Sequence, residues 1–343
     1  MKTVQSDDHR LHFPQGELYG GELVTPFERP SRVEHVLNRL RERGFPAPVG
    51  PGSLDMGPVR RIHAPDFLEF LETGWSEWEA AGFKGEMIAA AFPARRMHTG
   101  RPPVNIDGKL GYYALATETA ITGGTWGAAQ ASCAVAQSAQ RLVSGGERAA
   151  FALCRPPGHH ATADMFGGYC FLNNAAVAAE MFRLDGAKRV AILDVDFHHG
   201  NGTQDIFYNR GDVLFVSLHG APEHAFPYFL GYADETGAGE GEGANLNYPM
   251  PPGAAYDRWA EALDHGIGKI RNFAPDALVV SLGVDAYKDD PISFFKLTSA
   301  DFMDCGRRIA ALGLPTLFCM EGGYAIAEIG VNAVNVLEGF EGA

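Results

Sequence analysis

Two carboxylates and two imidazoles stand together after one apolar run of the sequence. The run RVAIL at 189–193 leads directly into DVDFHHGNG at 194–202. An apolar run with β-branched residues is typical of a buried parallel strand, and ligands bind at the carboxyl ends of such strands. Asp196 and His198 are two positions apart, so an extended backbone points both side chains to one face. A carboxylate oxygen and an imidazole nitrogen that converge there suit a divalent transition metal such as zinc.

The same arrangement follows four other apolar runs, at 149–154, 213–218, 278–284 and 315–320. They lead into His159 and His160, into His219, into Asp285, and into Glu321 with Gly322, Gly323 and Tyr324. If the five runs are parallel neighbours, these groups gather at one edge of one sheet. An ordinary strand-to-helix loop explains polar residues after any single run equally well. Polar residues after all five runs favour a functional site.

Asp196, His198 and Asp285 are the candidate metal ligands. Three protein ligands leave an open position, which is typical of a catalytic zinc site. His159 and His160 follow the rigid turn Pro156-Pro157-Gly158, and a hydrolase needs one imidazole as general base and gains from a second.

Each imidazole also needs an orienting group at its far nitrogen. Asp194 and Asn201 flank the metal pair and are the candidates for this role. Tyr324 follows two glycines and could donate to an oxyanion on the substrate carbonyl. The alternative for this tyrosine is a buried ring with a capped hydroxyl.

The bulk properties narrow the class of protein. The 343 residues are 46% hydrophobic and carry a formal net charge of −14. The sequence has no basic patch of the kind that predicts nucleic-acid binding. It also has no run of about 18 apolar residues, which a membrane span would need. No apolar signal core follows Met1, so we expect no export. Five cysteines without CxxC spacing fit a reducing compartment, and we expect a cytoplasmic protein.

Strand-like runs alternate with helical stretches expected at 118–144, 174–184, 256–273 and 299–312. This rhythm predicts one α/β domain, residues 1–343, with a parallel sheet. Residues 75–115 carry tryptophan, phenylalanine and methionine without such a rhythm, and we interpret them as an insertion loop. We expect it to form a homodimer interface and the active-site entrance. The alternative is a lid packed on its own domain.

The motifs together resemble the zinc-dependent histone deacetylase superfamily, which has an arginase-like fold. They are RPPGHH at 155–160, DVDFHHGNG at 194–202, SLH at 217–219, LGVD at 282–285 with Asp290-Pro291, and EGGY at 321–324. Residues 17–23, the insertion, Gly111-Tyr112-Tyr113 with Glu118, and residues 164–170 are most similar to the bacterial acetylpolyamine amidohydrolase branch.

The resemblance implies an α/β fold with a central eight-stranded parallel sheet flanked by helices. It implies zinc on Asp196, His198 and Asp285. It also implies that His160 is general base and then acid, that His159 is an electrostatic partner bound to Asp194, and that Tyr324 is the oxyanion donor. Histone-type members often have Asp where this chain has Asn201, and a neutral amide raises an imidazole pKa less than a carboxylate does.

The resemblance also implies the surroundings of the metal. Tyr169 and Phe226 correspond to the aromatic walls of the acyl channel, with Ile292 near its rim. Tyr19 belongs to the entrance segment at 17–23, and Asp107 and Glu118 could hold a distal ammonium group. A potassium site would use Asp194, Asp196, His198, Ser217 and Leu218, several of them through backbone carbonyls.

The leading functional hypothesis is hydrolysis of small cationic acetylated amines, namely acetylputrescine, acetylcadaverine and acetylspermidine, with acetate as the second product. The first rival is a lysine deacetylase acting on proteins or peptides. It would use the same chemistry but would need a wider entrance to the active-site channel. A second rival is a non-catalytic acetyl-amine binding protein, which would not need Tyr324. An arginase-type hydrolase would need more ligands for a two-metal centre.

Overall fold

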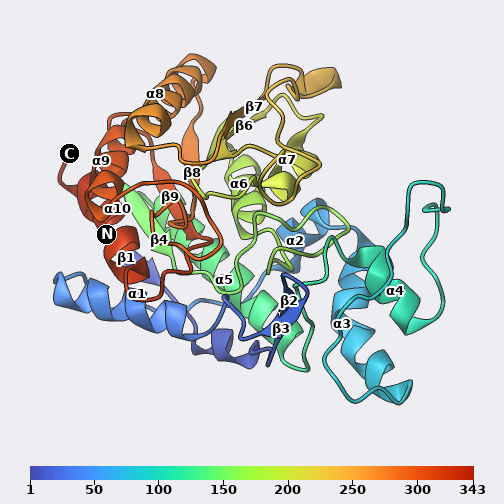
Figure 1. The fold of residues 1–343 in the computed structure, drawn as a ribbon. Helices are drawn as coiled ribbons and strands as arrows, with labels where there is room; N and C mark the ends of the chain where they lie inside the picture. The colour runs from blue at the N-terminus through green and yellow to red at the C-terminus, as the bar shows by residue number, and fades with distance from the viewer.

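A seven-stranded parallel sheet forms the centre of the molecule in the computed structural model, which describes residues 1–343 (Figure 1). The strand order is β1-β4-β9-β8-β5-β6-β7. The strands are β1 (Lys2–Val4), β4 (Ala149–Ala152), β5 (Val190–Asp194), β6 (Val213–Gly220), β7 (Asn245–Met250), β8 (Ala277–Leu282) and β9 (Thr316–Met320). The α/β class and the five predicted strands are confirmed.

The prediction of an eighth strand in this sheet is wrong. Beside the outer strand β1 the chain forms only a single parallel bridge, between Val4 and Val49, and no strand pairs with the other outer strand, β7, on its free side. The two remaining strands of the chain, β2 (Glu17–Tyr19) and β3 (Glu22–Val24), pair with each other antiparallel instead. They form a hairpin away from the sheet, where they can approach the site.

Helices cover both faces of the sheet (Figure 1). One face carries α1 (Ser31–Glu42), α8 (Tyr256–Phe273), α9 (Ser299–Ala310) and α10 (Ile329–Glu341). The other carries α2 (Met56–Ile62), α3 (Pro65–Ala80), α4 (Ile106–Tyr113), α5 (Thr125–Ser144), α6 (Asn174–Leu184) and α7 (Asn201–Phe207). Two short 3-10 turns, at Asp7–Leu11 and Gly239–Gly241, complete the chain.

The central strand β5 shows how the sheet separates two cores. Val190 and Ile192 pack in one core, whereas Ala191 and Leu193 pack in the other. Alternate side chains of a strand point to opposite faces, so a strand covered on both sides must be apolar at every position. This explains why the strands could be found as continuous apolar runs.

The predicted helices at 174–184 and 256–273 match α6 and α8, and that at 299–312 ends two residues early, at Ala310. The helix expected at 118–144 is wrong at its start, because α5 begins at Thr125. Thr125 Oγ1 accepts the Thr122 N–H at 2.8 Å. Glu118 and Thr119 are used elsewhere, since their side chains accept the N–H groups of Gly168 and Tyr169.

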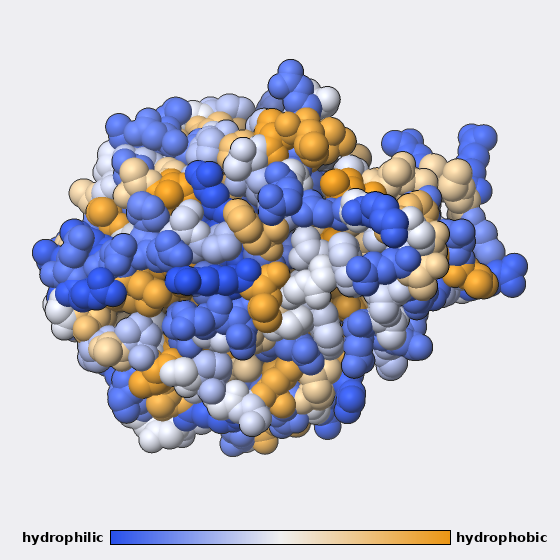
Figure 2. All heavy atoms as spheres, turned by 90° about the horizontal axis from the view of Figure 1, so that it is seen from below, coloured by the Kyte–Doolittle hydropathy of each residue, from blue (hydrophilic) through white to orange (hydrophobic).

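The insertion at 75–115 is more regular than expected. Its first residues complete α3, where Trp78 is buried and donates from Nε1 to the Gly85 carbonyl at 2.8 Å. Its last residues form α4. Between these helices, residues 81–105 include an arm that projects from the body of the molecule (Figures 1 and 2). Met97 and Val104 on this arm are 63% and 93% exposed.

No helix combines the length and the apolar character that crossing a bilayer requires. All five cysteines are buried and free of disulfides.

Candidate active site

The predicted groups meet at the carboxyl ends of four neighbouring strands, β4, β9, β8 and β5. His159 and His160 follow β4, Tyr324 follows β9, Asp285 follows β8, and Asp194, Asp196 and His198 end or follow β5. All of these residues are at most 8% exposed. A parallel sheet brings such strand ends to one edge, so the strand order alone accounts for their convergence.

Asp196, His198 and Asp285 present one potential ligand atom each within 4.8 Å of one another. Nδ1 of His198 lies 3.4 Å from Asp196 Oδ1 and 2.9 Å from Asp285 Oδ2. Ligand atoms at tetrahedral zinc distances are separated by about 3.3 Å, so these three donors fit a zinc ion with little movement.

Two glycines keep the space around this cluster open. A Cβ atom on Gly283 would lie 1.9 Å from Asp196 Oδ2, and one on Gly322 would lie 2.5 Å from Asp285 Oδ2. Any larger residue at these positions would therefore displace a ligand carboxylate.

Backbone groups hold the ligand carboxylates in place. The Phe197 N–H donates to Asp285 Oδ1 at 2.6 Å, and the His198 N–H donates to Asp196 Oδ1 at 2.9 Å. The Gly322 N–H donates to Asp196 Oδ2 at 2.7 Å. Partners of this kind orient metal ligands and tune their affinity, so the cluster is preorganised for an ion.

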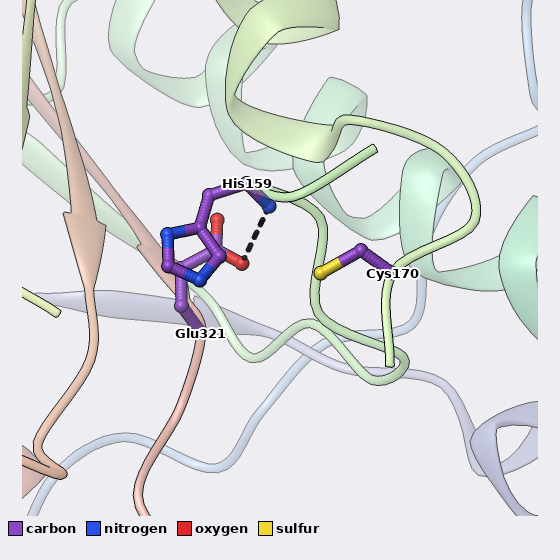
Figure 3. Close-up of side chains that lie close together, drawn as sticks. All are labelled: His159, Cys170 and Glu321. Atoms are coloured by element: carbon purple, nitrogen blue, oxygen red, sulfur yellow. Dashed lines mark hydrogen bonds between the residues drawn. The ribbon is translucent and has the colours of Figure 1, made fainter. Parts of the chain in front are cut away.

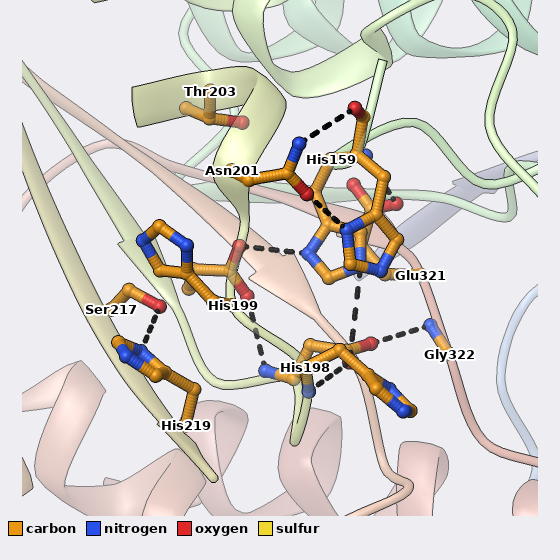
Figure 4. A network of polar contacts seen from close by, with 12 residues as sticks. His159, His198, His199, Asn201, Thr203, Ser217, His219, Glu321 and Gly322 are labelled. Atoms are coloured by element: carbon orange, nitrogen blue, oxygen red, sulfur yellow. Dashed lines mark hydrogen bonds and ion pairs between the residues drawn. The ribbon is translucent and has the colours of Figure 1, made fainter. Parts of the chain in front are cut away.

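The two adjacent histidines have different partners (Figure 4). Nδ1 of His159 lies 2.9 Å from Asp194 Oδ2, and Nδ1 of His160 lies 2.7 Å from Asn201 Oδ1. Asp194 and Asn201 are the orienting groups that the sequence offers, and the pairing of His159 with Asp194 is the one that the family resemblance implies. The ring centroids of His159 and His160 are 4.1 Å apart, so the charge of one ring acts on the other.

The surroundings of the two rings shift their pKa values in opposite directions. Burial opposes protonation of His159, but the charge of Asp194 prevails and raises the pKa of this imidazole to about 10. Burial, followed by the charges of His159 and His198, lowers the pKa of His160 well below its usual value. A neutral His160 beside a charged His159 is the combination that a general base and an electrostatic partner require.

Tyr324 stays a hydrogen-bond donor at neutral pH, because burial raises the pKa of its phenol well above its usual value. The Arg32 guanidinium lies 5.0 Å from the centre of the Tyr324 ring and donates to the Gly323 carbonyl at 2.8 Å. The Tyr324 N–H donates to Asp290 Oδ2 at 2.7 Å. The sequence analysis missed Arg32, because an arginine within an amphipathic helix gives no local sign of a contact almost 300 positions away.

A cavity of about 480 Å³ opens onto these groups. His160, His198 and Tyr324 line it together with five of the predicted entrance residues, Tyr19, Glu118, Tyr169, Phe226 and Ile292. Asp107 is the exception: it lies in the first turn of α4, exposed to solvent, and does not line the cavity of its own chain. Leu18, His224, Tyr228 and Phe294 also line the cavity and were not singled out from the sequence.

The wall residue Tyr169 is held by the N-terminal hairpin. Its hydroxyl donates to Glu17 Oε1 at 3.0 Å, and its backbone adopts a positive φ of 66°. Burial raises the pKa of Glu17 to about 7. The sequence analysis placed residues 17–23 near the entrance without identifying this contact.

The residues predicted for potassium are neighbours. Asp194 on β5 is in register with Ser217 on β6, and both are fully buried, as is Leu218. The Ser217 hydroxyl lies 2.8 Å from His219 Nδ1, and the other nitrogen of His219 lies 2.8 Å from the Gly231 carbonyl oxygen. His219 therefore belongs to a buried network beside the site and does not line the cavity.

Comparison with known proteins matches this geometry to a family. The histone deacetylase domain matches residues 26–340. The chain belongs to the histone deacetylase family. A relative in Pseudomonas aeruginosa, acetylpolyamine amidohydrolase 1, is 56% identical over 344 residues and covers 100% of this chain and 99% of its own. The acetylpolyamine amidohydrolase of Mycoplana ramosa is also 56% identical, with 100% of both chains covered.

Solved structures agree with the fold. The crystal structure of the acetylpolyamine aminohydrolase from Burkholderia pseudomallei has a TM-score of 0.93 and 40% identity, and it covers 99% of this chain and 98% of its own. The HDA15 HD domain has a TM-score of 0.81 and 27% identity, and the match covers 99% of this chain and 89% of that one. The predicted family, the deacetylase-like fold and the assignment as a hydrolase are confirmed.

Proposed function

We propose that this enzyme removes acetyl groups from N-acetylated polyamines and small diamines, such as acetylputrescine, acetylcadaverine and acetylspermidine, and releases acetate. The observation that carries the proposal is that His198 of the metal cluster, His160 and the Tyr324 phenol all line one cavity, whose walls also carry aromatic side chains and the Glu118 carboxylate. The full-length relatives named acetylpolyamine amidohydrolases support the choice of substrate.

In the proposed reaction, Asp196, His198 and Asp285 would hold a zinc ion, which would supply Lewis-acid polarisation of the amide carbonyl and lower the pKa of the attacking water. Nε2 of His160 accepts the proton of this water as its oxygen bonds to the carbonyl carbon. His160 then returns the proton to the amine nitrogen as the carbon–nitrogen bond breaks. The acetic acid so formed gives its proton to the amine, so the products are acetate and the protonated amine, and atoms and protons balance.

His159 and Tyr324 stabilise the charge that develops in this step. The Tyr324 hydroxyl donates to the carbonyl oxygen as it gains negative charge. His159, kept protonated by Asp194, adds a positive charge close to His160. Asn201 holds Nδ1 of His160, which leaves Nε2 for the proton transfer.

The walls of the cavity favour a slender substrate with a positive charge. Tyr169 and Phe226 line the cavity and would enclose the acetylated end of the substrate. Ile292 lines the same cavity, and so does Tyr19 from the N-terminal hairpin. Glu118 is half-buried on the same wall, and its Oε1 is held by the Gly168 N–H at 2.9 Å. A fixed carboxylate there attracts a distal ammonium group, which an acetylated diamine carries and a simple alkyl amide lacks.

We also propose a homodimer in which the arm of one subunit helps to wall the entrance of the other. The exposed Met97 and Val104 on the arm support it, since apolar residues of this kind are typical of interfaces. A symmetric dimer is the commonest oligomer. Asp107 would meet a substrate ammonium only through such an assembly, because it lies outside the cavity of its own chain.

Two further assignments belong to the proposal. Potassium would bind beside the zinc site through Asp194, Asp196, His198, Ser217 and Leu218, for which the register of β5 with β6 is the support. The enzyme would act in the cytoplasm on small metabolites and not on nucleic acid or membranes. Five buried free thiols suit a reducing compartment.

The test of substrate class is a parallel turnover assay with acetylputrescine, acetylspermidine and an acetyl-lysine peptide. We expect both acetylated polyamines to have a higher kcat/KM than the peptide. Glu118→Gln should lower kcat/KM for acetylputrescine but not for N-acetylbutylamine, which has no distal charge. A higher kcat/KM for the peptide would overturn the proposal in favour of a lysine deacetylase.

A further inference from the structure

Glu321 is a buried carboxylate that the proposed chemistry does not use. It follows β9 directly, is 0% exposed, and does not line the cavity. Its Oε2 accepts the backbone N–H of Gly158 at 2.6 Å and that of His159 at 3.2 Å. Its Oε1 is buried without any partner. An unpartnered buried oxygen is costly, so the presence of this carboxylate indicates a role beyond packing.

The contacts of Glu321 join two catalytic segments that are far apart in the sequence. The side chain holds the turn that carries His159 and His160 after β4. The adjacent Gly322 N–H holds the ligand carboxylate of Asp196 at 2.7 Å. Arg32, which lies under the Tyr324 ring, donates to the Glu321 carbonyl. Glu321 and the peptide bond that follows it therefore contact the histidine turn, the ligand Asp196 and the Arg32 side chain beneath the phenol.

A second metal site is the alternative reading of this region. His159, Cys170 and Glu321 bring possible ligand atoms within 4.8 Å of one another (Figure 3). However, Nδ1 of His159 is already paired with Asp194, and Glu321 Oε2 already accepts two N–H groups. The Cys170 thiol lies 3.3 Å from the Gly168 carbonyl oxygen, and burial raises the pKa of this thiol well above its usual value. Glu321 Oε1 remains free, but the Cys170 thiol donates its proton to the Gly168 carbonyl, and a protonated thiol is not a metal ligand, so this cluster does not carry a metal site.

We propose that Glu321 is a positioning residue, which fixes the histidine turn relative to the metal centre by accepting the N–H groups of Gly158 and His159. Hydrogen bonds from backbone N–H groups to a carboxylate are short and strong. They act on the placement of the His159 and His160 rings and not on the aromatic walls or Glu118, which hold the rest of the substrate. Loss of the acceptor should therefore lower kcat and leave KM nearly unchanged.

Three substitutions separate geometry from charge. Glu321→Gln keeps an oxygen of the same reach without the charge. Glu321→Asp keeps the charge but is shorter by one methylene, so it withdraws the oxygen from both N–H groups. Glu321→Ala removes both properties. The control is Glu180→Gln on α6, since Glu180 is also a buried carboxylate but binds Arg210 at 2.8 Å away from the cavity.

The experiment measures kcat and KM for acetylputrescine, together with zinc content and melting temperature. A misplacement of about 1 Å costs on the order of 10²-fold in rate, so we expect a loss of this size in kcat for the Asp and Ala variants. KM should change by less than about twofold, because no substrate contact is lost. Glu321→Gln should retain most of the parent kcat, as should Glu180→Gln, with zinc content unchanged throughout.

Two results would overturn the inference. The first is a higher kcat for Glu321→Asp than for Glu321→Gln, which would show that the charge matters more than the position of the oxygen. The second is a kcat equal to that of the parent enzyme in both the Asp and the Ala variants. If Glu321→Ala fails to fold, the Asp and Gln pair alone decides. The inference rests on the proposed function, but the two fail differently. An inactive parent enzyme refutes the function, whereas an active parent with unaffected variants refutes only the role of Glu321.

Discussion

Asn201→Asp should move the acid limb of the pH–rate profile to higher pH. The variant replaces the neutral oxygen that lies 2.7 Å from Nδ1 of His160 with a charged one of the same shape. The neighbouring pair shows the expected direction. His159 is equally buried and lies 2.9 Å from the Asp194 carboxylate, and its pKa is raised to about 10, whereas the pKa of His160 is lowered.

The size of the shift follows from the charge and its distance. Unit charges about 4 Å apart interact by about 4 kcal/mol at an effective dielectric constant of about 20. This corresponds to a rise of about 3 units in the pKa of His160. Burial of the new carboxylate reduces this gain, because it disfavours the charged form of Asp. We therefore expect a shift of at least about 1 unit.

The assay is kcat/KM for acetylputrescine between pH 5 and pH 9, since this parameter reports the pKa of the essential base in the free enzyme. His160 works only when it is unprotonated. The parent enzyme should therefore lose activity only below pH 6.5, and the variant should lose it at higher pH, about tenfold for each unit below its new pKa. Asn38→Asp on the exposed side of α1 adds the same charge elsewhere and should leave the profile unchanged. Coincident profiles for Asn201→Asp and the parent, at equal zinc content, would refute His160 as the titrating base.

Other perturbations test the remaining parts of the site. Asp285→Ala should abolish zinc binding and activity in a folded chain, because it removes one of three ligands; full zinc occupancy by elemental analysis would contradict the assignment. Tyr324→Phe should lower kcat by about 10²–10³-fold at unchanged zinc content, and parent turnover would make the phenol structural. His160→Ala should lose more turnover than His159→Ala, and the reverse order in zinc-loaded variants would exchange their roles. Deletion of residues 94–104 should weaken the dimer and raise relative activity on acetyl-lysine peptides; a wild-type monomer in sedimentation would refute the arrangement.

The strand ends and their chemistry could be predicted because both signals are local. A strand buried on both faces must be apolar throughout, and the polar residues that follow it must lie at the sheet edge. Asp194 and Asn201 could also be anticipated as orienting groups, since they flank the metal ligands in sequence, but which histidine each one binds came from the family resemblance.

Features that depend on distant contacts could not be predicted. The alanine-rich pattern placed Glu118 in a helix, but contacts to Gly168 and Tyr169, 50 positions away, hold residues 118 and 119 in a loop. Glu17 binds Tyr169 across 152 positions. Residues 75–80 are the last residues of a helix that begins at Pro65. A segment that starts at residue 75 contains only the end of this helix, so its helical pattern could not be recognised.

The central claim is that one metal ion on Asp196, His198 and Asp285 supports hydrolysis of an acetyl amide. The most direct measurement is a zinc titration of the metal-free enzyme, with acetate release from acetylputrescine as the readout. We predict that activity rises in proportion to zinc and reaches its plateau at one ion per chain. A plateau only at two ions per chain, or no acetate at any ratio, would contradict the claim.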